Sequence, residues 1–594
     1  MSRVVQDPPE PLQTTGVAAP ATAAPGSAAP AGAERFPAER WGWTLVWLGL
    51  LTGGVNVWGF WWSSPLTVVL AAVMVLGGIA GMVATWVVSP RAGPLQWLGQ
   101  LGALTCAAFP QAVVIHTSTY YHTDSAAFVD VSAHALLHGE NPYTTSMAAA
   151  ARLLRVPDRY WTYTTTGSHV AHASYPAGSF LVDMPALLLG LGHHVVDWMD
   201  LAAWLVTGVL VFVLLPVTLR WLAALVTLTP IFIGMFGNSG TDASFLPFLV
   251  LAVWRWDRFG QGSPAGVARW LGPVALGLAC SVKQLPWFCV PVLATGVALE
   301  ARARGARPAG VVTRYLAMVA GAFAAVNVAF VVWSPGPWLH GTLTPFVDPL
   351  VADGQGLVSL ATHGLTGGVD LTDLTLAGAL AYLGTVVAFV AFYHHLKRIW
   401  PLVLPVVFFF SVRSLSSYLV DLFPVAVLAI TSVATVAPPG APRRAGAAPR
   451  ARPAGGGRRA VPWRPAAAVG ALAVGVVVAS ALAFSSAPLQ LQVRAVQTSH
   501  GGHALRSVTL TVRNRTGRTL VPHFLVNTGA NPNGFWNPPG GVAPAVGAGR
   551  SETLTLEPPP GTLAPQRGAH WLVEAYTADP RALSTSPLVA WPRG

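Results

Sequence analysis

The chain has 594 residues, of which 53% are hydrophobic and only 10% are charged. Soluble domains usually carry about 25% charged residues, so the composition excludes an ordinary soluble enzyme and indicates a polytopic membrane protein. The formal net charge of +12 does not point to nucleic acid, because the arginines cluster in short segments between apolar runs, as they do in cytoplasmic loops.

The N-terminal part predicts a tail followed by three membrane spans. Residues 1–40 are rich in Ala, Pro and Gly and lack the apolar stretch of a signal peptide, which predicts a disordered cytoplasmic tail. Apolar runs follow at about 43–62, 66–88 and 95–115, each near the ~20 residues that a bilayer core requires. Arg91 indicates a cytoplasmic turn before the third run, which places the polar segment 116–176 outside.

The remaining apolar runs extend the predicted membrane domain over residues 41–437. They lie at about 178–193, 197–216, 219–236, 243–256, 266–282, 285–299, 314–333, 376–393, 398–411, 417–437 and 466–486. The three earlier runs and these eleven, fourteen together, would return the chain to the cytoplasm after the last run. An Arg-rich linker at 438–464 is expected to be cytoplasmic, which would put the chain outside after the last run. We therefore expect one short run not to cross the membrane. The run at 178–193, which contains Asp183 and Pro185, is the best candidate, and about thirteen transmembrane helices are expected.

Two more segments are predicted to lie outside the cell. The first is a second polar loop at 334–375, which lies between two apolar runs. The second is 488–594, which follows the last predicted span at 465–487. There LQLQVRAV, SVTLTVRN, ETLTLEP and WLVEAY alternate apolar and polar residues between Gly, Pro and Asn turns. This alternation predicts a small β-sandwich, in which Trp571 is expected in the core.

The 116–176 loop is where chemistry is expected, because a polar loop of this length between spans is uncommon unless it is functional. Asp124 follows the third apolar run by a few residues. Its carboxylate could reach a substrate at the membrane surface, or it could be a helix N-cap, because Asp before Ser-Ala-Ala-Phe favours a cap. Asp130 would lie on the far side of a helix from Asp124 and is expected to be structural.

The segment TDSAAFVDVSAHALLHGENPY resembles the first outer loop of membrane glycosyltransferases with the GT-C fold. It is most similar to the polyprenol-phosphate-mannose-dependent α-mannosyltransferases (glycosyltransferase family 87, the DUF2029-type proteins). In that family an Asp after a span precedes a helix and then Gly-x-x-Pro-Tyr. The matching elements here are Asp124, Gly139-Glu140-Asn141-Pro142-Tyr143, Tyr175-Pro176, Gly237-Asn238 followed by Asp242, and Lys283-Gln284-Leu285-Pro286. Ala177 replaces the second Pro of the family's Tyr-Pro-Pro, and the Asn238 element matches loosely.

The resemblance covers roughly 95–435 and does not include the C-terminal β region. It implies an all-α GT-C-like fold and binding of a lipid phosphate by Lys283. Lys283 is also the only charge between Leu271 and Leu299, and a lone cation near the bilayer is a candidate functional residue, unless it extends to the surface. Arg413 is expected to face outward, against the positive-inside trend, and to hold phosphate.

Further site residues complete the expectation. His172 is assigned to the donor phosphate, while Asn141, Tyr143, Tyr175, Asn238 and Tyr418 are assigned to substrate binding. No histidine spacing matches a metal site, so no cofactor is expected, although a divalent metal held by Asp124 and another acid is not excluded.

The predicted activity is transfer of a sugar, mannose by resemblance, from a polyprenyl-phosphate donor to a lipid-linked or cell-envelope glycan on the outer face of the cell membrane. Asp124 would act as general base with inversion at the anomeric carbon. Expected partners are the donor, the glycan acceptor and membrane lipids, and not nucleic acid. Two alternatives remain open: a transporter or flippase of lipid-linked sugars, and a catalytically inactive binding protein of envelope assembly.

Overall fold

A computed structural model of the chain shows a helical body with β-sheets at its C-terminal end. It describes residues 38–61, 65–192, 194–232, 243–261, 270–433, 463–485, 487–498, 504–527, 534–542, 544–559 and 570–591. The tail predicted at 1–40 and the linker predicted at 438–464 lie almost wholly outside the described residues, and Asn238 lies outside them too.

The long helices follow apolar runs of the sequence, and shorter helices also form in the polar segments 116–176 and 334–375. They are α1 (Ala38–Trp61), α2 (Pro65–Val87), α3 (Gly93–Thr117), α4 (Asp124–Leu137), α5 (Met147–Leu153), α6 (Gly178–Leu181), α7 (Met184–Leu188), α8 (Val195–Leu214), α9 (Arg220–Phe232), α10 (Leu246–Val253), α11 (Leu271–Val282), α12 (Cys289–Ala303), α13 (Pro308–Trp333), α14 (Pro335–Val347), α15 (Ser359–Thr362), α16 (Leu371–Ala391), α17 (Tyr393–Leu396), α18 (Trp400–Val403), α19 (Pro405–Phe409), α20 (Ser416–Val420), α21 (Phe423–Ser432) and α22 (Trp463–Ser485). Short 3₁₀ turns are η1 (Asp158–Tyr160), η2 (Val217–Leu219), η3 (Trp256–Arg258) and η5 (Leu285–Phe288).

Six helices of the described chain are long and apolar enough to cross a membrane, which supports a membrane-embedded protein. These spans are Thr67–Val87, Gly93–Thr117, Val195–Leu214, Pro308–Trp333, Leu371–Ala391 and Ala466–Ser485. Three other apolar runs are divided into the short pairs α6 and α7, α18 and α19, and α20 and α21. A proline is the first or second residue of the second helix of each pair, where its missing N–H would interrupt a continuous helix.

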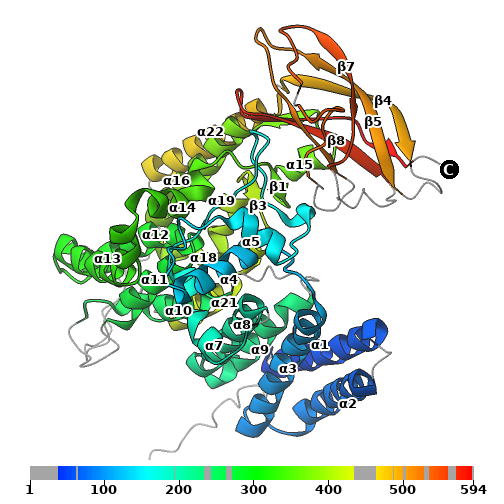
Figure 1. Cartoon of the computed structure of the whole chain (residues 1–594). Helices are drawn as coiled ribbons and strands as arrows, with labels where there is room; N and C mark the ends of the chain where they lie inside the picture. Colours follow the sequence, from blue (N-terminus) through cyan, green and yellow to red (C-terminus); the bar gives the residue numbers. More distant parts are fainter. Residues whose placement is uncertain are drawn as a thin grey trace, which may run out of the picture.

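Strands β4, β5, β7 and β8 gather at one end of the molecule, β1 and β3 lie nearer its middle, and α1 and α2 lie at the opposite end (Figure 1). The strands have the bounds β1 (Asp353–Gly354), β2 (Gly368–Asp370), β3 (Arg413–Ser414), β4 (Leu489–Thr498), β5 (Leu505–Asn514), β6 (His523–Asn527), β7 (Ser551–Leu556), β8 (His570–Thr577), β9 (Ala582–Thr585) and β10 (Val589–Ala590). One sheet has the order β4-β5-β7, and a second has β10-β8-β9-β2 with β6 also paired to β8. Val508 and Leu510 of the first sheet share a hydrophobic core with Trp571 and Val573 of the second, as expected of two packed layers.

The β region predicted at 488–594 also includes a strand from the 334–375 segment and contacts both predicted outer loops. Strand β2 comes from the 334–375 segment and pairs antiparallel with β9. The Tyr576 hydroxyl donates to the carbonyl of Ala352 (3.3 Å), and the Tyr163 ring of the first predicted outer loop packs on Phe535 with centroids 5.1 Å apart. Both predicted outer loops therefore hold the sheets in place.

Pairing of β2 with β9 depends on Gly368, and this gives a first prediction. Gly368 has a φ of +146°, and a Cβ at this position would lie 2.2 Å from the carbonyl oxygen of Leu583. Gly368→Val should therefore lower the free energy of unfolding by about 1–3 kcal/mol, the usual cost of forcing atoms into packed structure, with a lower thermal midpoint in detergent. The matched control is Gly367→Val, because a Cβ there meets no heavy atom within 4 Å. Equal midpoints for the two variants would contradict the assigned docking.

Candidate functional site

Asp124 is the first residue of α4, and the residue that caps this helix is Thr123. The Thr123 side chain accepts a hydrogen bond from the backbone N–H of Ala126 (3.2 Å). The Asp124 carboxylate instead accepts from the backbone N–H of Thr162 (2.5 Å) and from its hydroxyl (3.2 Å). The capping interpretation of Asp124 is therefore wrong, and the carboxylate, which is only 5% exposed, connects α4 to the later part of the loop.

The electrostatic environment of Asp124 makes it a stronger base than a solvated carboxylate. Burial raises the pKa of Asp124 above its ordinary value, and the hydrogen bonds from Thr162 and the charge of Arg413 oppose this only in part. A carboxylate has about four lone-pair positions, so two bonds from Thr162 leave room for a substrate hydroxyl. A base with a raised pKa is better matched to proton abstraction near neutral pH.

Asp130, six residues further along α4, has a structural environment. Its carboxylate accepts a hydrogen bond from the Tyr121 hydroxyl (2.8 Å) and lies 2.9 Å from Nδ1 of His134. This agrees with the structural role expected for it.

Arg413 reaches the neighbourhood of Asp124 from a different part of the chain. It lies in β3, which pairs parallel with β1, and its Nη2 is 3.3 Å from Oδ2 of Asp353 in β1. Its charge also acts on Asp124, Tyr175 and Tyr418. Asp353, which the sequence did not single out, thus fixes one end of the guanidinium while the rest faces the predicted site residues.

Lys283 is buried at the C-terminal end of α11, where it is the residue that follows the last helical turn. Only 7% of it is exposed. Its Nζ lies 5.2 Å from the ring centroid of Tyr175 and 5.8 Å from that of Tyr418, within the range of cation–π attraction. Lys283 and Arg413 therefore share Tyr175 and Tyr418 as neighbours.

A cleft opens beside Lys283, with about 440 Å³ of empty space, part of which is open to solvent. Helices α4, α6 and α8 and the end of α11 supply most of its wall. Its polar lining residues are Ser125, Tyr175, Ser179, Asp183, Asp200, Ser244 and Lys283. Ser125, which directly follows Asp124 in α4, lines this cleft, whereas Asp124 itself is not among the lining residues.

Two acids of the cleft, Asp183 and Asp200, were not predicted as site residues. Asp200 accepts hydrogen bonds from the backbone N–H groups of Ala243 (3.2 Å) and Ser244 (3.0 Å) and from the Ser244 hydroxyl. Asp183 is 1% exposed, and neither of its carboxylate oxygens has a hydrogen-bond partner within the described ranges. The signal in the sequence was an acid inside an apolar run, which marks a functional position by default.

Asn141 and Tyr143, which were also predicted to bind substrate, do not line the cleft. Asn141 donates to the Ser334 hydroxyl (2.7 Å) and accepts from the backbone N–H of Tyr143 (3.0 Å). The buried Tyr143 donates its hydroxyl to the carbonyl of Tyr175 (2.8 Å). These bonds connect both residues to segments beside the cleft, and their assignment to substrate binding stays a prediction.

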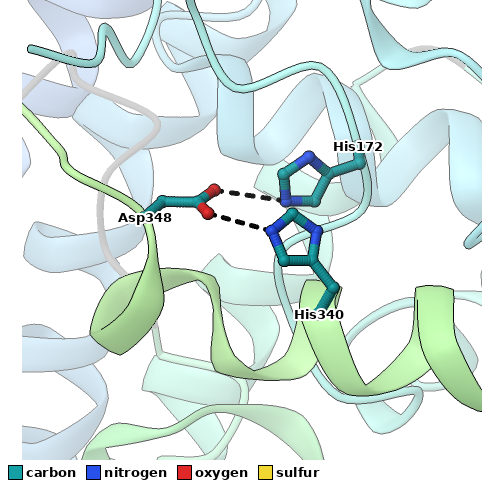
Figure 2. Close-up of side chains that lie close together, drawn as sticks. All are labelled: His172, His340 and Asp348. Carbon is teal, nitrogen blue, oxygen red and sulfur yellow. Dashed lines mark hydrogen bonds and ion pairs between the residues drawn. The ribbon is translucent and has the colours of Figure 1, made fainter. Parts of the chain in front are cut away.

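His172, predicted to bind the donor phosphate, faces a different group of residues. Its Nε2 is 2.7 Å from the Thr344 hydroxyl and 3.5 Å from Oδ2 of Asp348, and its ring lies against His340 (Figure 2). Burial and the neighbouring His340 lower the pKa of His172, with Asp348 acting in the opposite direction. A neutral imidazole is a poor phosphate ligand, so this environment does not support the assignment.

Comparison with known proteins assigns no family. No protein-family model matches the chain, no curated protein matches its sequence, and no solved structure matches its fold.

The unpartnered Asp183 leads to a prediction about stability. The charges of Asp200, Asp130 and Asp197 repel an ionised Asp183. Replacing Asp183 with an apolar residue of similar size would remove this repulsion and also the buried carboxylate. Asp183→Leu should raise the free energy of unfolding by about 1–3 kcal/mol. Asp130→Leu is the matched comparison and should lower it by a similar amount, because the Tyr121 hydroxyl loses its acceptor. Thermal unfolding in detergent measures both, and a lower midpoint for Asp183→Leu would show that the carboxylate stabilises the fold.

Proposed function

We propose that the chain is a membrane glycosyltransferase of the GT-C type, which transfers a sugar from a polyprenyl-phosphate donor to a lipid-linked or cell-envelope glycan. The observation that supports this best is the position of Arg413. Its charge interacts with the buried Asp124 carboxylate and with Tyr175 and Tyr418, and these are the two tyrosines whose rings the Lys283 ammonium approaches. Mannose is the sugar that the family resemblance implies.

The two cations fit the phosphate of such a donor. Lys283 offers a compact ammonium beside an open cleft, and Arg413 offers a planar fork of N–H donors, one end of which is fixed by Asp353. Charge-assisted hydrogen bonds to phosphate are roughly twice as strong as neutral ones. The lipid tail would remain among the apolar helices, with Tyr175 and Tyr418 between phosphate and sugar.

The proposed reaction is a single in-line displacement. The acceptor hydroxyl oxygen forms a bond to the anomeric carbon as the bond from that carbon to the phosphate oxygen breaks, which inverts the configuration. Asp124 takes the hydroxyl proton, and the polyprenyl phosphate departs with the bonding electron pair, stabilised by Lys283 and Arg413. The step requires no cofactor.

The proposed membrane arrangement follows the positive-inside rule. About thirteen crossings of the cell membrane would place α4, α14 and the β-sheets on the external side. The β region, which both predicted outer loops hold, would then lie beside the route by which a glycan acceptor approaches Asp124.

The decisive comparison is between Asp124→Asn and Asp130→Asn in a transfer assay. Purified protein receives radiolabelled mannosyl-phosphoryl-polyprenol and alkyl mannosides as acceptors, and labelled product is measured. Asparagine keeps the size and the acceptor oxygen for Thr162 but removes the base, so Asp124→Asn should lose about 10²–10⁴-fold in rate. Asp130→Asn should retain activity near that of the unmodified chain.

The same assay separates the alternatives. Full activity of Asp124→Asn would remove the catalytic assignment. If the unmodified chain forms no product but carries labelled lipid across a vesicle membrane, a flippase is correct. Neither transfer nor transport would favour a binding protein of envelope assembly.

A further inference from the structure

A group of side chains outside the cleft brings two imidazoles and a carboxylate together. His172 comes from the first predicted outer loop, while His340 lies in α14 and Asp348 directly follows that helix. Nε2 of His172 is 3.5 Å from Oδ2 of Asp348, and Nε2 of His340 is 3.0 Å from Oδ1. Figure 2 shows both rings directed at the same carboxylate.

The spacing of these atoms is that of metal ligands. The ligand nitrogens and carboxylate oxygens of the three residues lie within 4.8 Å of one another. Tetrahedral zinc has ligand bonds of about 2.0–2.2 Å, which puts neighbouring ligand atoms roughly 3.3 Å apart. The observed 3.0 Å and 3.5 Å nitrogen–oxygen distances lie on either side of this value, and the two imidazole nitrogens lie within 4.8 Å of each other. Coordination would require side-chain rotations that also release Nε2 of His172 from the Thr344 hydroxyl.

The donor set selects the kind of ion. Imidazole nitrogen suits zinc and similar transition metals, whereas magnesium and calcium require ligands that are all or nearly all oxygen. We propose that His172, His340 and Asp348 bind one zinc ion, with the fourth position open to water. The side chain of His340 is 54% exposed, so the ion can enter from solvent.

Bound zinc would fasten the first predicted outer loop to α14 beside the wall of the cleft. The loop already contacts this region: Gln284 donates to the carbonyls of Ser174 (3.0 Å) and Thr342 (2.9 Å). A Cβ on Gly341 would lie 2.2 Å from the carbonyl oxygen of Ala173, so the backbones touch. Tyr175, whose ring faces Lys283, follows within three residues of His172. The ion would thus link the loop to α14, and the zinc site does not depend on the proposed glycosyl transfer.

The test uses the full chain, purified in detergent with a tag that contains no histidine and treated with a chelator. Zinc chloride is then added, and bound zinc and the thermal midpoint are measured. The unmodified chain should bind one zinc per molecule and unfold at a higher temperature with zinc. His340→Asn and Asp348→Asn should each lose at least 10–100-fold in zinc affinity and most of the rise in midpoint.

His363→Asn is the matched control, because His363 is also a histidine of the 334–375 segment but bonds locally to the carbonyl of Ser359. It should bind zinc like the unmodified chain. Because His340 is exposed, His340→Asn should fold normally. Its thermal midpoint without zinc should therefore equal that of the unmodified chain without zinc. Two outcomes would show that the three residues form only a hydrogen-bonded group. One is zinc binding that neither His340→Asn nor Asp348→Asn weakens, and the other is binding of less than a tenth of a zinc ion per unmodified chain.

Discussion

The burial of the Lys283 ammonium is the constraint on which the arrangement of the site depends. A charged group this far from water is costly unless other groups compensate it. Two aromatic faces do so, at about 0.5–2 kcal/mol each, and the negative end of the α11 dipole adds a favourable field. Tyr175 must therefore stay under the ammonium, and the bond from the Tyr143 hydroxyl to its carbonyl fixes it there. Phosphate is the kind of anion that a cation of this type binds.

The same requirement connects the sheets to the membrane helices. Arg413 forms an ion pair with Asp353, and the two residues lie opposite each other in the short β1–β3 pairing. The carbonyl of the neighbouring Ala352 accepts a hydrogen bond from the Tyr576 hydroxyl of β8. The β region thus supports the segment that positions Arg413. In the proposed enzyme, the sheets stabilise one half of the phosphate site while α11 supplies the other.

Sequence reasoning found the parts of the molecule that depend on local pattern. Apolar runs predicted the long helices, and alternation placed β4, β5, β7 and β8. It did not predict the features that depend on contacts between distant segments. Thr123 and Asp124 are both good caps, and only the fold shows that Thr162 takes the carboxylate. Strand β2 has three residues, too few for alternation. The approach of His340 to His172 depends on two distant segments, which no spacing within the sequence reveals.

Photo-crosslinking with polyprenyl phosphate tests the central claim most directly. The probe carries a photoreactive group next to the phosphate, and labelled peptides are identified by mass spectrometry with and without excess unlabelled polyprenyl phosphate. The account predicts labelling of peptides that contain Tyr175, Lys283 or Tyr418, suppressed by the competitor and weakened in Lys283→Met. Labelling confined to lipid-facing helices such as α2 and unaffected by competitor would contradict it.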